Sequence, residues 1–310
     1  MTTPCNAMPE SFEPRPIAAA ANALTRPFYW SVRRELYEYR SIYLAPLAIG
    51  GVILLGFVFV LVRLPQDMRT PGGMQMMMMH HRDRIAQPFD FAAGLIMAAA
   101  FLISVFYSVE TLYGERRDRS ILFWKSLPVS DLTSVLAKAS IPLFVLPVIA
   151  YGVTLVLEII MLLLSSAVVA GNGLSVTQFW NHLQMFPMMF NLFYHIVTVH
   201  MLWYAPLYAW LLLISAWAKR VPFLWAVLPP FAIGIFEKMA FHTAHFAAFM
   251  QWRFSGGREA IEGAQGNVLD PEMHLTPGPF LATPGLWLGL LFAAVFLIAA
   301  ARLRRQRAPL

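Results

Sequence analysis

A run of methionines and histidines, GGMQMMMMHH over residues 72–81, has the clearest metal-binding chemistry in the chain. Thioether sulfur and imidazole are soft ligands that suit copper(I). The same methionines are also the residues of an adaptable apolar surface, and one run without a repeat leaves both interpretations open. We expect no other metal site. The candidate copper ligands are Met76, Met77, Met78, Met79, His80 and His81.

Glu158 is the one acidic residue in the long apolar stretch 140–164. A carboxylate inside a membrane is costly unless it is protonated, paired or in contact with water. Glu158 is therefore a candidate for lining a transport pathway. The alternative is a protonated carboxyl group that is hydrogen-bonded to a neighbouring helix.

The sequence shows no combination of side chains that is typical of an enzyme active site. His195 and His200 are five residues apart, which turns them about 140° from each other on an α-helix, so they serve a single metal ion poorly. The chain contains no Gly-Lys dipeptide and hence no GxxxxGK[ST] phosphate loop. No nucleophile and base can be placed on facing helices. We therefore expect no catalytic residues in this chain, and any energy from ATP must come from a separate protein.

The elements that must position these side chains are membrane helices. The chain has 310 residues, of which 58% are hydrophobic and 13% charged, more apolar side chains than one soluble core can bury. A helix needs about 20 apolar residues to cross a bilayer. Six stretches qualify, at approximately 41–62, 91–110, 140–164, 190–218, 221–236 and 285–301, of which the fourth is overlong and the fifth is short and interrupted by Pro229 and Pro230.

The orientation of these spans follows from the distribution of Lys and Arg, because cytoplasmic flanks retain positive charge. Of the 23 such residues, 16 lie before the first span, between spans two and three, between spans four and five, and after the last span. Both termini and the connection between spans two and three are therefore predicted to be cytoplasmic. The outer connection 237–284 begins with the apolar run AFHTAHFAAFMQW, which indicates either re-entrant helices packed on protein or a loop that caps the bundle.

Residues 27–40 predict an amphipathic helix that lies flat on the inner leaflet. Phe28, Tyr29, Val32, Leu36 and Tyr39 share one face at helical spacing, with charged residues opposite. Residues 1–26 are rich in proline and small residues and are predicted to be a disordered cytoplasmic tail. The domain organisation is then this tail followed by one transmembrane domain, residues 27–310.

The cytoplasmic segment 113–140 reads YGERRDRSILFWKSLPVSDLTSVLAKAS. Glu115, Ser120 and the sequence Leu127-Pro128-Val129-Ser130 follow in order the pattern of permease subunits of type-2 ATP-binding cassette (ABC) exporters, with Lys138 where a basic residue often follows. Arg119 stands where glycine is usual in that family. The chain resembles this family over its whole architecture, from a flat amphipathic helix through six spans to a long outer connection before the last.

The resemblance implies that residues 114–130 form a coupling helix that docks on an ABC ATPase subunit, which binds ATP and Mg. It also implies a dimer with a second permease copy or a paralogue, no cofactor in this chain, a bacterial inner-membrane location, and export of a lipid-like, peptide or drug-like substrate. The rival interpretation is a membrane sensor or assembly protein that transports nothing. The implied contacts with the ATPase are Glu115, Arg116, Ser120, Phe123, Trp124, Leu127 and Pro128.

Overall fold

The computed structural model describes residues 17–68, 82–126, 129–171, 173, 175–254 and 277–306, and every regular element in these ranges is helical. The prediction of an all-α protein is thus confirmed for the described residues. In chain order the elements are α1 (Ile17–Glu38), α2 (Ser41–Met68), α4 (Arg82–Arg117), α5 (Ser120–Lys125), α6 (Asp131–Ser140), the π-helix η1 (Ile141–Val145), α7 (Leu146–Gly171), α8 (Val176–Leu183), α9 (Met185–His195), the π-helix η2 (Ile196–Trp203), α10 (Ala205–Trp217), α11 (Pro222–Phe241), α12 (His245–Phe254), α13 (Pro277–Ala282) and α14 (Pro284–Gln306).

Six helical segments of the described chain are long and apolar enough to cross a membrane, which confirms the predicted number. Segments of this length and composition indicate a multi-pass membrane protein. Their bounds are Ser41–Phe59, Ala86–Arg117, Asp131–Gly171, Val176–Trp203, Pro222–Phe241 and Pro284–Gln306.

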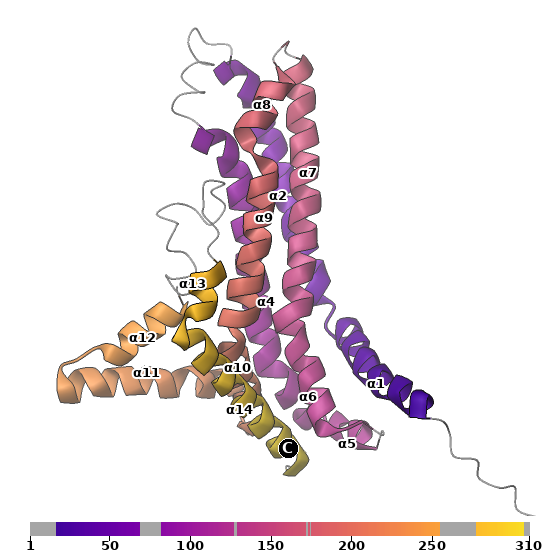
Figure 1. Ribbon diagram of the computed structural model, residues 1–310, viewed down its shortest axis with the longest axis vertical. Helices are drawn as coiled ribbons and strands as arrows, with labels where there is room; N and C mark the ends of the chain where they lie inside the picture. The colour runs from indigo at the N-terminus through magenta and orange to yellow at the C-terminus, as the bar shows by residue number, and fades with distance from the viewer. Residues whose placement is uncertain are drawn as a thin grey trace, which may run out of the picture.

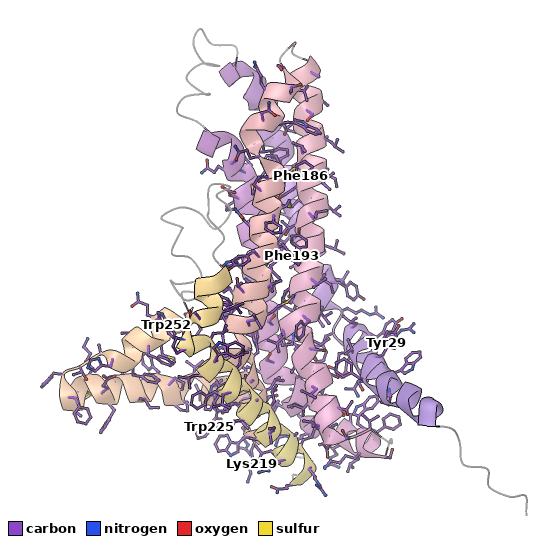
Figure 2. All side chains as sticks on the ribbon, in the orientation of Figure 1. Tyr29, Phe186, Phe193, Lys219, Trp225 and Trp252 are labelled. Atoms are coloured by element: carbon purple, nitrogen blue, oxygen red, sulfur yellow. The ribbon has the colours of Figure 1, made fainter. Side chains whose placement is uncertain are left out.

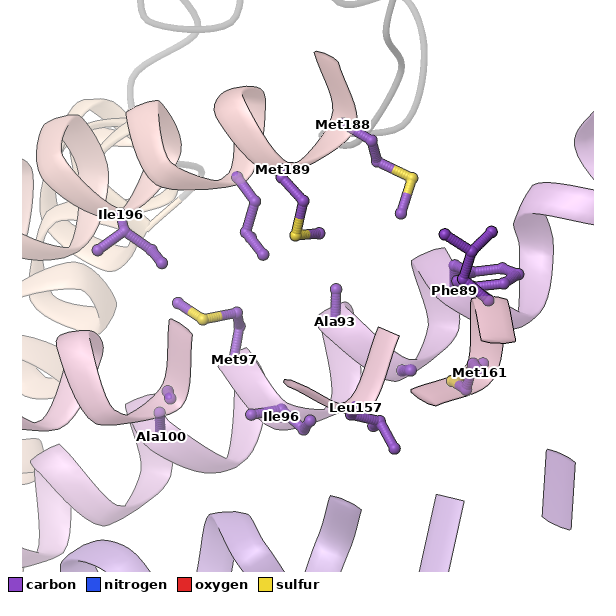
Figure 3. Packing of buried hydrophobic residues seen from close by; sticks show 14 of the residues in the cluster. Phe89, Ala93, Ile96, Met97, Ala100, Leu157, Met161, Met188, Met189 and Ile196 are labelled. Carbon is purple, nitrogen blue, oxygen red and sulfur yellow. The ribbon is translucent and has the colours of Figure 1, made fainter. Parts of the chain in front are cut away.

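The long helices α2, α4, α7 and α9 run side by side and form one bundle (Figure 1). Its core is apolar and contains several methionines, among them Met97, Met161 and Met189, which fill the space between α4, α7 and α9 (Figure 3). The unbranched methionine side chain fills irregular gaps between helices well.

Large apolar side chains are also exposed on the outer surface of the described helices. Figure 2 shows Tyr29, Phe186 and Trp225 projecting from different helices, and their exposed fractions are 59%, 84% and 45%. A soluble monomer rarely exposes large apolar side chains over so much of its surface. Lipid contact on these faces is the physical explanation.

The fourth predicted span, 190–218, is divided in the structure. The spanning segment ends at Trp203, and a separate apolar helix, α10, follows from Ala205. Pro206 is the second residue of α10 and has no N–H to continue the preceding hydrogen-bond ladder. The apparent excess length of this stretch therefore reflects two helices.

The fifth predicted span does not break at its two prolines, because α11 continues through Pro229 and Pro230. Pro230 cannot donate to the carbonyl of Ala226, and the indole N–H of Trp210 donates to that oxygen instead, at 3.2 Å. In Figure 1, α11 runs across the long axis of the bundle, and α12 turns back beside it.

The N-terminal helix is longer than predicted. Residues 17–26, predicted as part of a disordered tail, form the first turns of α1, consistent with the high helix propensity of their alanines. Val32, Leu36 and Tyr39 pack against the bundle, whereas Tyr29 on the same predicted face is exposed. Residues 1–16, the candidate copper ligands 76–81, Leu127, Pro128 and residues 255–276 of the outer connection lie outside the described residues.

Candidate functional site

The helix α5 forms the tip of the predicted coupling segment. It begins directly after Arg119, whose φ of 59° places the residue in the left-handed region. This conformation suits glycine better than arginine, and it turns the chain sharply between α4 and α5. Ile121 is buried and anchors α5, while Leu122 and Phe123 are 59% and 61% exposed. The tip of the segment therefore presents an apolar surface of its own.

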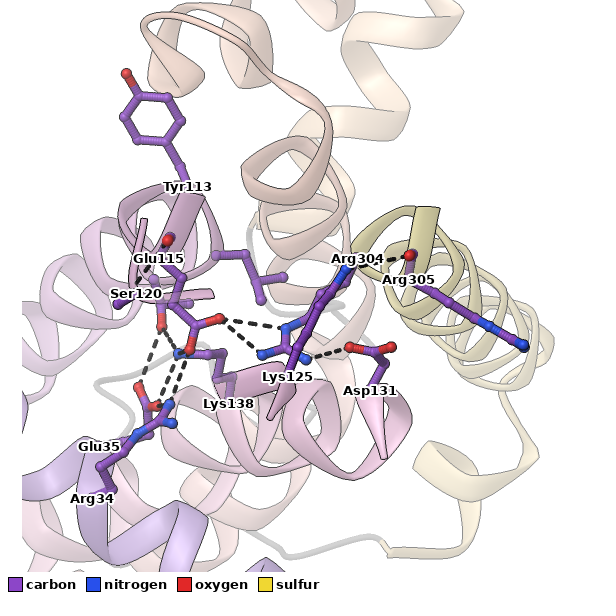
Figure 4. A network of polar contacts seen from close by, with 12 residues as sticks. Arg34, Glu35, Tyr113, Glu115, Ser120, Lys125, Asp131, Lys138, Arg304 and Arg305 are labelled. Atoms are coloured by element: carbon purple, nitrogen blue, oxygen red, sulfur yellow. Dashed lines mark hydrogen bonds and ion pairs between the residues drawn. The ribbon is translucent and has the colours of Figure 1, made fainter. Parts of the chain in front are cut away.

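Glu115 lies at the base of this segment and is buried, with 4% exposure. Its Oε1 is 3.0 Å from the guanidinium of Arg34 on α1 and 3.2 Å from Nζ of Lys138 on α6. Its Oε2 is 3.2 Å from the guanidinium of Arg304 on α14. One carboxylate thus joins three cations from three other helices (Figure 4).

Glu35 on α1 is the second buried carboxylate of the cluster, with no exposed surface. It accepts a hydrogen bond from Lys138 Nζ at 2.8 Å, another from the Tyr107 hydroxyl at 2.8 Å, and one from the guanidinium of Arg34. Lys138 also donates to the Thr111 hydroxyl at 2.8 Å. The amphipathic helix is therefore bound to the bundle by buried charge as well as by its apolar face.

Arg304 extends the cluster to the end of the last span. Besides Glu115, it pairs with Asp131, the first residue of α6. We call the six side chains the ionic cluster. It contains three cations and three carboxylates and is therefore neutral overall; its members are Arg34, Glu35, Glu115, Asp131, Lys138 and Arg304.

The electrostatics of the cluster favour the ionised state of Glu35. Burial by itself would raise the pKa of this carboxyl group, but Lys138 and Arg34 outweigh that effect and lower the pKa to about 2. Glu38, one turn further along α1, shows the opposite balance, because burial and then the negative charge of Glu35 raise its pKa. The cation partners, and not solvent, therefore keep Glu35 charged.

Arg116 and Trp124 connect residues 114–126 to their surroundings. The guanidinium of Arg116 donates to the carbonyl oxygens of Ser215, at 3.0 Å, and of Ala218, at the C-terminal end of α10. Cations are favourable at a helix C-terminus because its last carbonyl groups lack helical partners. Trp124 lies under the guanidinium of Arg34, 3.8 Å from the ring centroid, a cation–π contact.

The structure therefore divides the residues predicted to contact an ATPase into two groups. Phe123 is exposed at the tip, and Trp124 is half-buried against it, with ring centroids 4.8 Å apart. Glu115 and Arg116 are buried, and Ser120 donates at 3.4 Å to the backbone carbonyl of Glu115. In this conformation the buried residues position the tip instead of forming its surface.

Sequence reasoning missed Glu35 as a member of this site. Its position between Arg34 and Leu36 gave no local sign of burial, and its partners Tyr107, Thr111 and Lys138 are 72 to 103 residues away. The available signal was weak: the apolar face of the amphipathic helix, Val32, Leu36 and Tyr39, lies on both sides of position 35.

His195 and His200, which the sequence analysis rejected as joint ligands of one metal ion, lie closer together than α-helical spacing predicts. The π-helix η2 begins directly after His195 and includes His200, and their ring centroids lie 5.6 Å apart. Hydrogen bonds from residue i to i+5 place residues five apart one turn above each other. The predicted separation of about 140° was therefore wrong, although no cluster of three or more potential ligands surrounds them in the described residues.

Glu158 lies on α7, fully buried, between Leu157 and Met161 of the apolar core. It has no contact with the ionic cluster among the interactions described above. Comparison of the chain with models of protein families, with curated proteins and with solved structures gave no significant match.

Proposed function

We propose that this chain is the membrane permease subunit of an ATP-driven ABC transporter in a bacterial inner membrane, with both termini cytoplasmic. In this proposal α5 docks on a separate ATPase subunit, which binds ATP and Mg. A second permease copy or a paralogue completes the translocation path, and the exported substrate is lipid-like, a peptide or drug-like.

The observation that carries the proposal is the exposed apolar tip of α5 directly above the buried ionic cluster. Leu122 and Phe123 are more than half exposed on a short helix, and aromatic side chains contribute most to binding when a partner buries them. The tip is small, as expected for a helix that fits a cleft in a partner. A lipid-facing surface would need no such rigid base.

The ionic cluster explains how force on this tip could reach the bundle. Glu115 is five residues before the start of α5 and bonds to α1, α6 and α14 at once. Arg116 bonds to the end of α10. Movement of α5 would therefore displace the ends of several helices together, which is the requirement for coupling ATPase closure to a change in the bundle.

Co-purification tests the proposal directly. The tagged full chain is purified in mild detergent from its native bacterial membranes, and an ABC ATPase subunit should copurify and hydrolyse Mg-ATP. Phe123→Ala should weaken the association about 30-fold, as expected when an aromatic anchor worth about 2 kcal/mol is removed.

Phe190→Ala is the matched control, because Phe190 is 60% exposed on α9, nearly the same fraction as Phe123. It should leave the association unchanged. If no ATPase copurifies, or if both variants weaken it equally, the chain is better explained as a membrane protein that transports nothing.

A further inference from the structure

One side of the helix α1 is occupied by protein. Val32, Leu36 and Tyr39, which belong to the stripe predicted to lie on the membrane, pack against the bundle instead. Glu35 on the same side is held inside the ionic cluster by Lys138 at 2.8 Å. These contacts fix the rotation of α1 and leave its opposite side to the surroundings.

The opposite side of α1 exposes an arginine between two aromatic rings. Trp30, Arg33 and Tyr37 are spaced three and four residues apart and therefore share one side of the helix. The guanidinium carbon of Arg33 is 5.1 Å from the centroid of the Trp30 ring and 5.5 Å from that of the Tyr37 ring. The exposed fractions of Trp30 and Tyr37 are 56% and 64%. We call these three side chains the aromatic–arginine face.

No carboxylate of the described residues pairs with Arg33, in contrast to the arginine beside it. Arg34 pairs with Glu35, Glu38 and Glu115. The aromatic–arginine face therefore carries a positive charge that the described part of the chain does not neutralise.

The guanidinium of Arg33 also retains hydrogen-bonding capacity. It has five N–H donors, one of which donates to the Tyr37 hydroxyl at 3.1 Å. Tyr29, one turn earlier on α1, is the other described residue whose hydroxyl interacts with it. Donors therefore remain for an acceptor from outside the chain, and the two stacked rings hold the guanidinium in position for it.

The aromatic–arginine face lies next to the start of a membrane span. The helix α1 ends at Glu38, and the first span begins at Ser41. Leu44 and Leu47 in the first turns of that span are 53% and 55% exposed, as expected of side chains that contact lipid. Tyr29 projects from α1 away from the bundle (Figure 2). Tryptophan and tyrosine are enriched at the level of the lipid headgroups, where a phosphate group is the most abundant acceptor.

We propose that the aromatic–arginine face binds the phosphate of an anionic phospholipid in the leaflet that α1 meets. The planar guanidinium of Arg33 donates parallel hydrogen bonds to two phosphate oxygens, and Trp30 and Tyr37 lie against the apolar part of the same lipid. A zwitterionic lipid binds less well, because the cation of its headgroup offsets the charge of its phosphate. The proposal concerns α1 alone and does not depend on transport by this chain.

Quenching of Trp30 by brominated lipids tests the proposal. The full chain is reconstituted in phosphatidylcholine bilayers that contain the same small fraction of either brominated phosphatidylglycerol or brominated phosphatidylcholine. Bromine quenches tryptophan fluorescence only at short range. The chain contains 9 tryptophans, so the signal of Trp30 is obtained as the difference between each chain and the same chain with Trp30→Phe.

Arg117→Gln is the matched control for Arg33→Gln. Arg117 is also an exposed arginine over an aromatic ring, 5.6 Å from the centroid of Tyr113. It differs in being paired with two carboxylates, Glu110 at 2.9 Å and Asp118 at 3.1 Å. The control therefore removes the same surface charge without removing an unpaired guanidinium.

In the unchanged chain, brominated phosphatidylglycerol should quench Trp30 more strongly than brominated phosphatidylcholine. Arg33→Gln should reduce this preference about fivefold, as expected for the loss of one basic side chain at an anionic membrane surface. Arg117→Gln should leave the preference unchanged. Equal quenching of Trp30 by the two lipids, or no quenching by either, would overturn the proposal. An equal loss of preference in both arginine variants would also overturn it, because surface charge alone would then explain the effect.

Discussion

Replacing Lys138 by methionine should be among the most destabilising single changes in the described chain. Its ammonium group lies 2.8 Å from Glu35 and 3.2 Å from Glu115, and all three side chains are at most 3% exposed. At an effective dielectric constant of about 20, each contact corresponds to about 5–6 kcal/mol of attraction. Much of this is offset by the cost of burying the ammonium group, and removal of one partner from a buried pair typically costs about 3–5 kcal/mol.

Two further variants separate this effect from lost packing. Arg117→Met removes an ion pair of similar length, 2.9 Å to Glu110, but these side chains are 52% and 40% exposed. This variant should lose much less stability than Lys138→Met, because solvent screens an exposed ion pair. Glu35→Gln combined with Lys138→Met restores neutrality of the ionic cluster and should be more stable than Lys138→Met alone.

The free energy of unfolding is measured by reversible denaturation with sodium dodecyl sulfate from mild-detergent micelles, followed by tryptophan fluorescence. The expected order of stability is wild type, then Arg117→Met, then the double variant, then Lys138→Met. A loss for Lys138→Met no larger than that for Arg117→Met would refute the electrostatic account of the cluster. So would a double variant that is less stable than Lys138→Met.

Three further predictions use the same measurement. Gly285→Ala places a methyl group against the rigid indole of Trp252 and should cost about 1–3 kcal/mol, whereas Gly152→Ala meets no atom within 4 Å and should gain up to about 1 kcal/mol; equal effects would contradict this packing. Ser130→Ala removes the side-chain acceptor of the first turn of α6 and should cost about 1 kcal/mol. Because the pKa of Glu35 falls from 4.5 in an unfolded chain to about 2, its charge contributes stability that is complete above about pH 4.5 and lost as the pH falls toward 2. The difference in unfolding free energy between wild type and Glu35→Gln should therefore shrink by about 3 kcal/mol over this range, and a difference independent of pH would contradict it.

The sequence predicted what depends on local composition. Runs of about 20 apolar residues identified six spans, and the change from charged to apolar residues after Glu115 located α5 within the cytoplasmic segment. Both features follow from neighbours along the chain. The predicted ends of the spans were less accurate where a backbone hydrogen-bond donor is missing, as at Pro206. There the run of apolar residues continues across the division between two helices.

Features that depend on distant partners could not be predicted in the same way. The helix α11 continues through Pro229 and Pro230, and the carbonyl of Ala226 accepts a hydrogen bond from Trp210 on another helix instead. His195 and His200 come together because the backbone adopts i to i+5 hydrogen bonds, a geometry that the residue types do not indicate. In both cases a rule derived from isolated helices gave the wrong geometry.

The burial of six charged side chains in the ionic cluster needs an explanation other than the stability of the fold. Glu115 is 81 residues from Arg34 and 189 from Arg304, so no local pattern pairs them. Well-packed apolar residues often stabilise a protein as much as a buried ion pair does, so stability alone does not explain six charges at this point. Ion pairs fix the relative positions of helices better than apolar contacts do, because each ion pair is satisfied in only one arrangement. The cluster fixes α1, α4, α6 and α14 relative to one another next to an exposed apolar helix, and under the proposed function this fixed arrangement would transmit the position of that helix to the bundle.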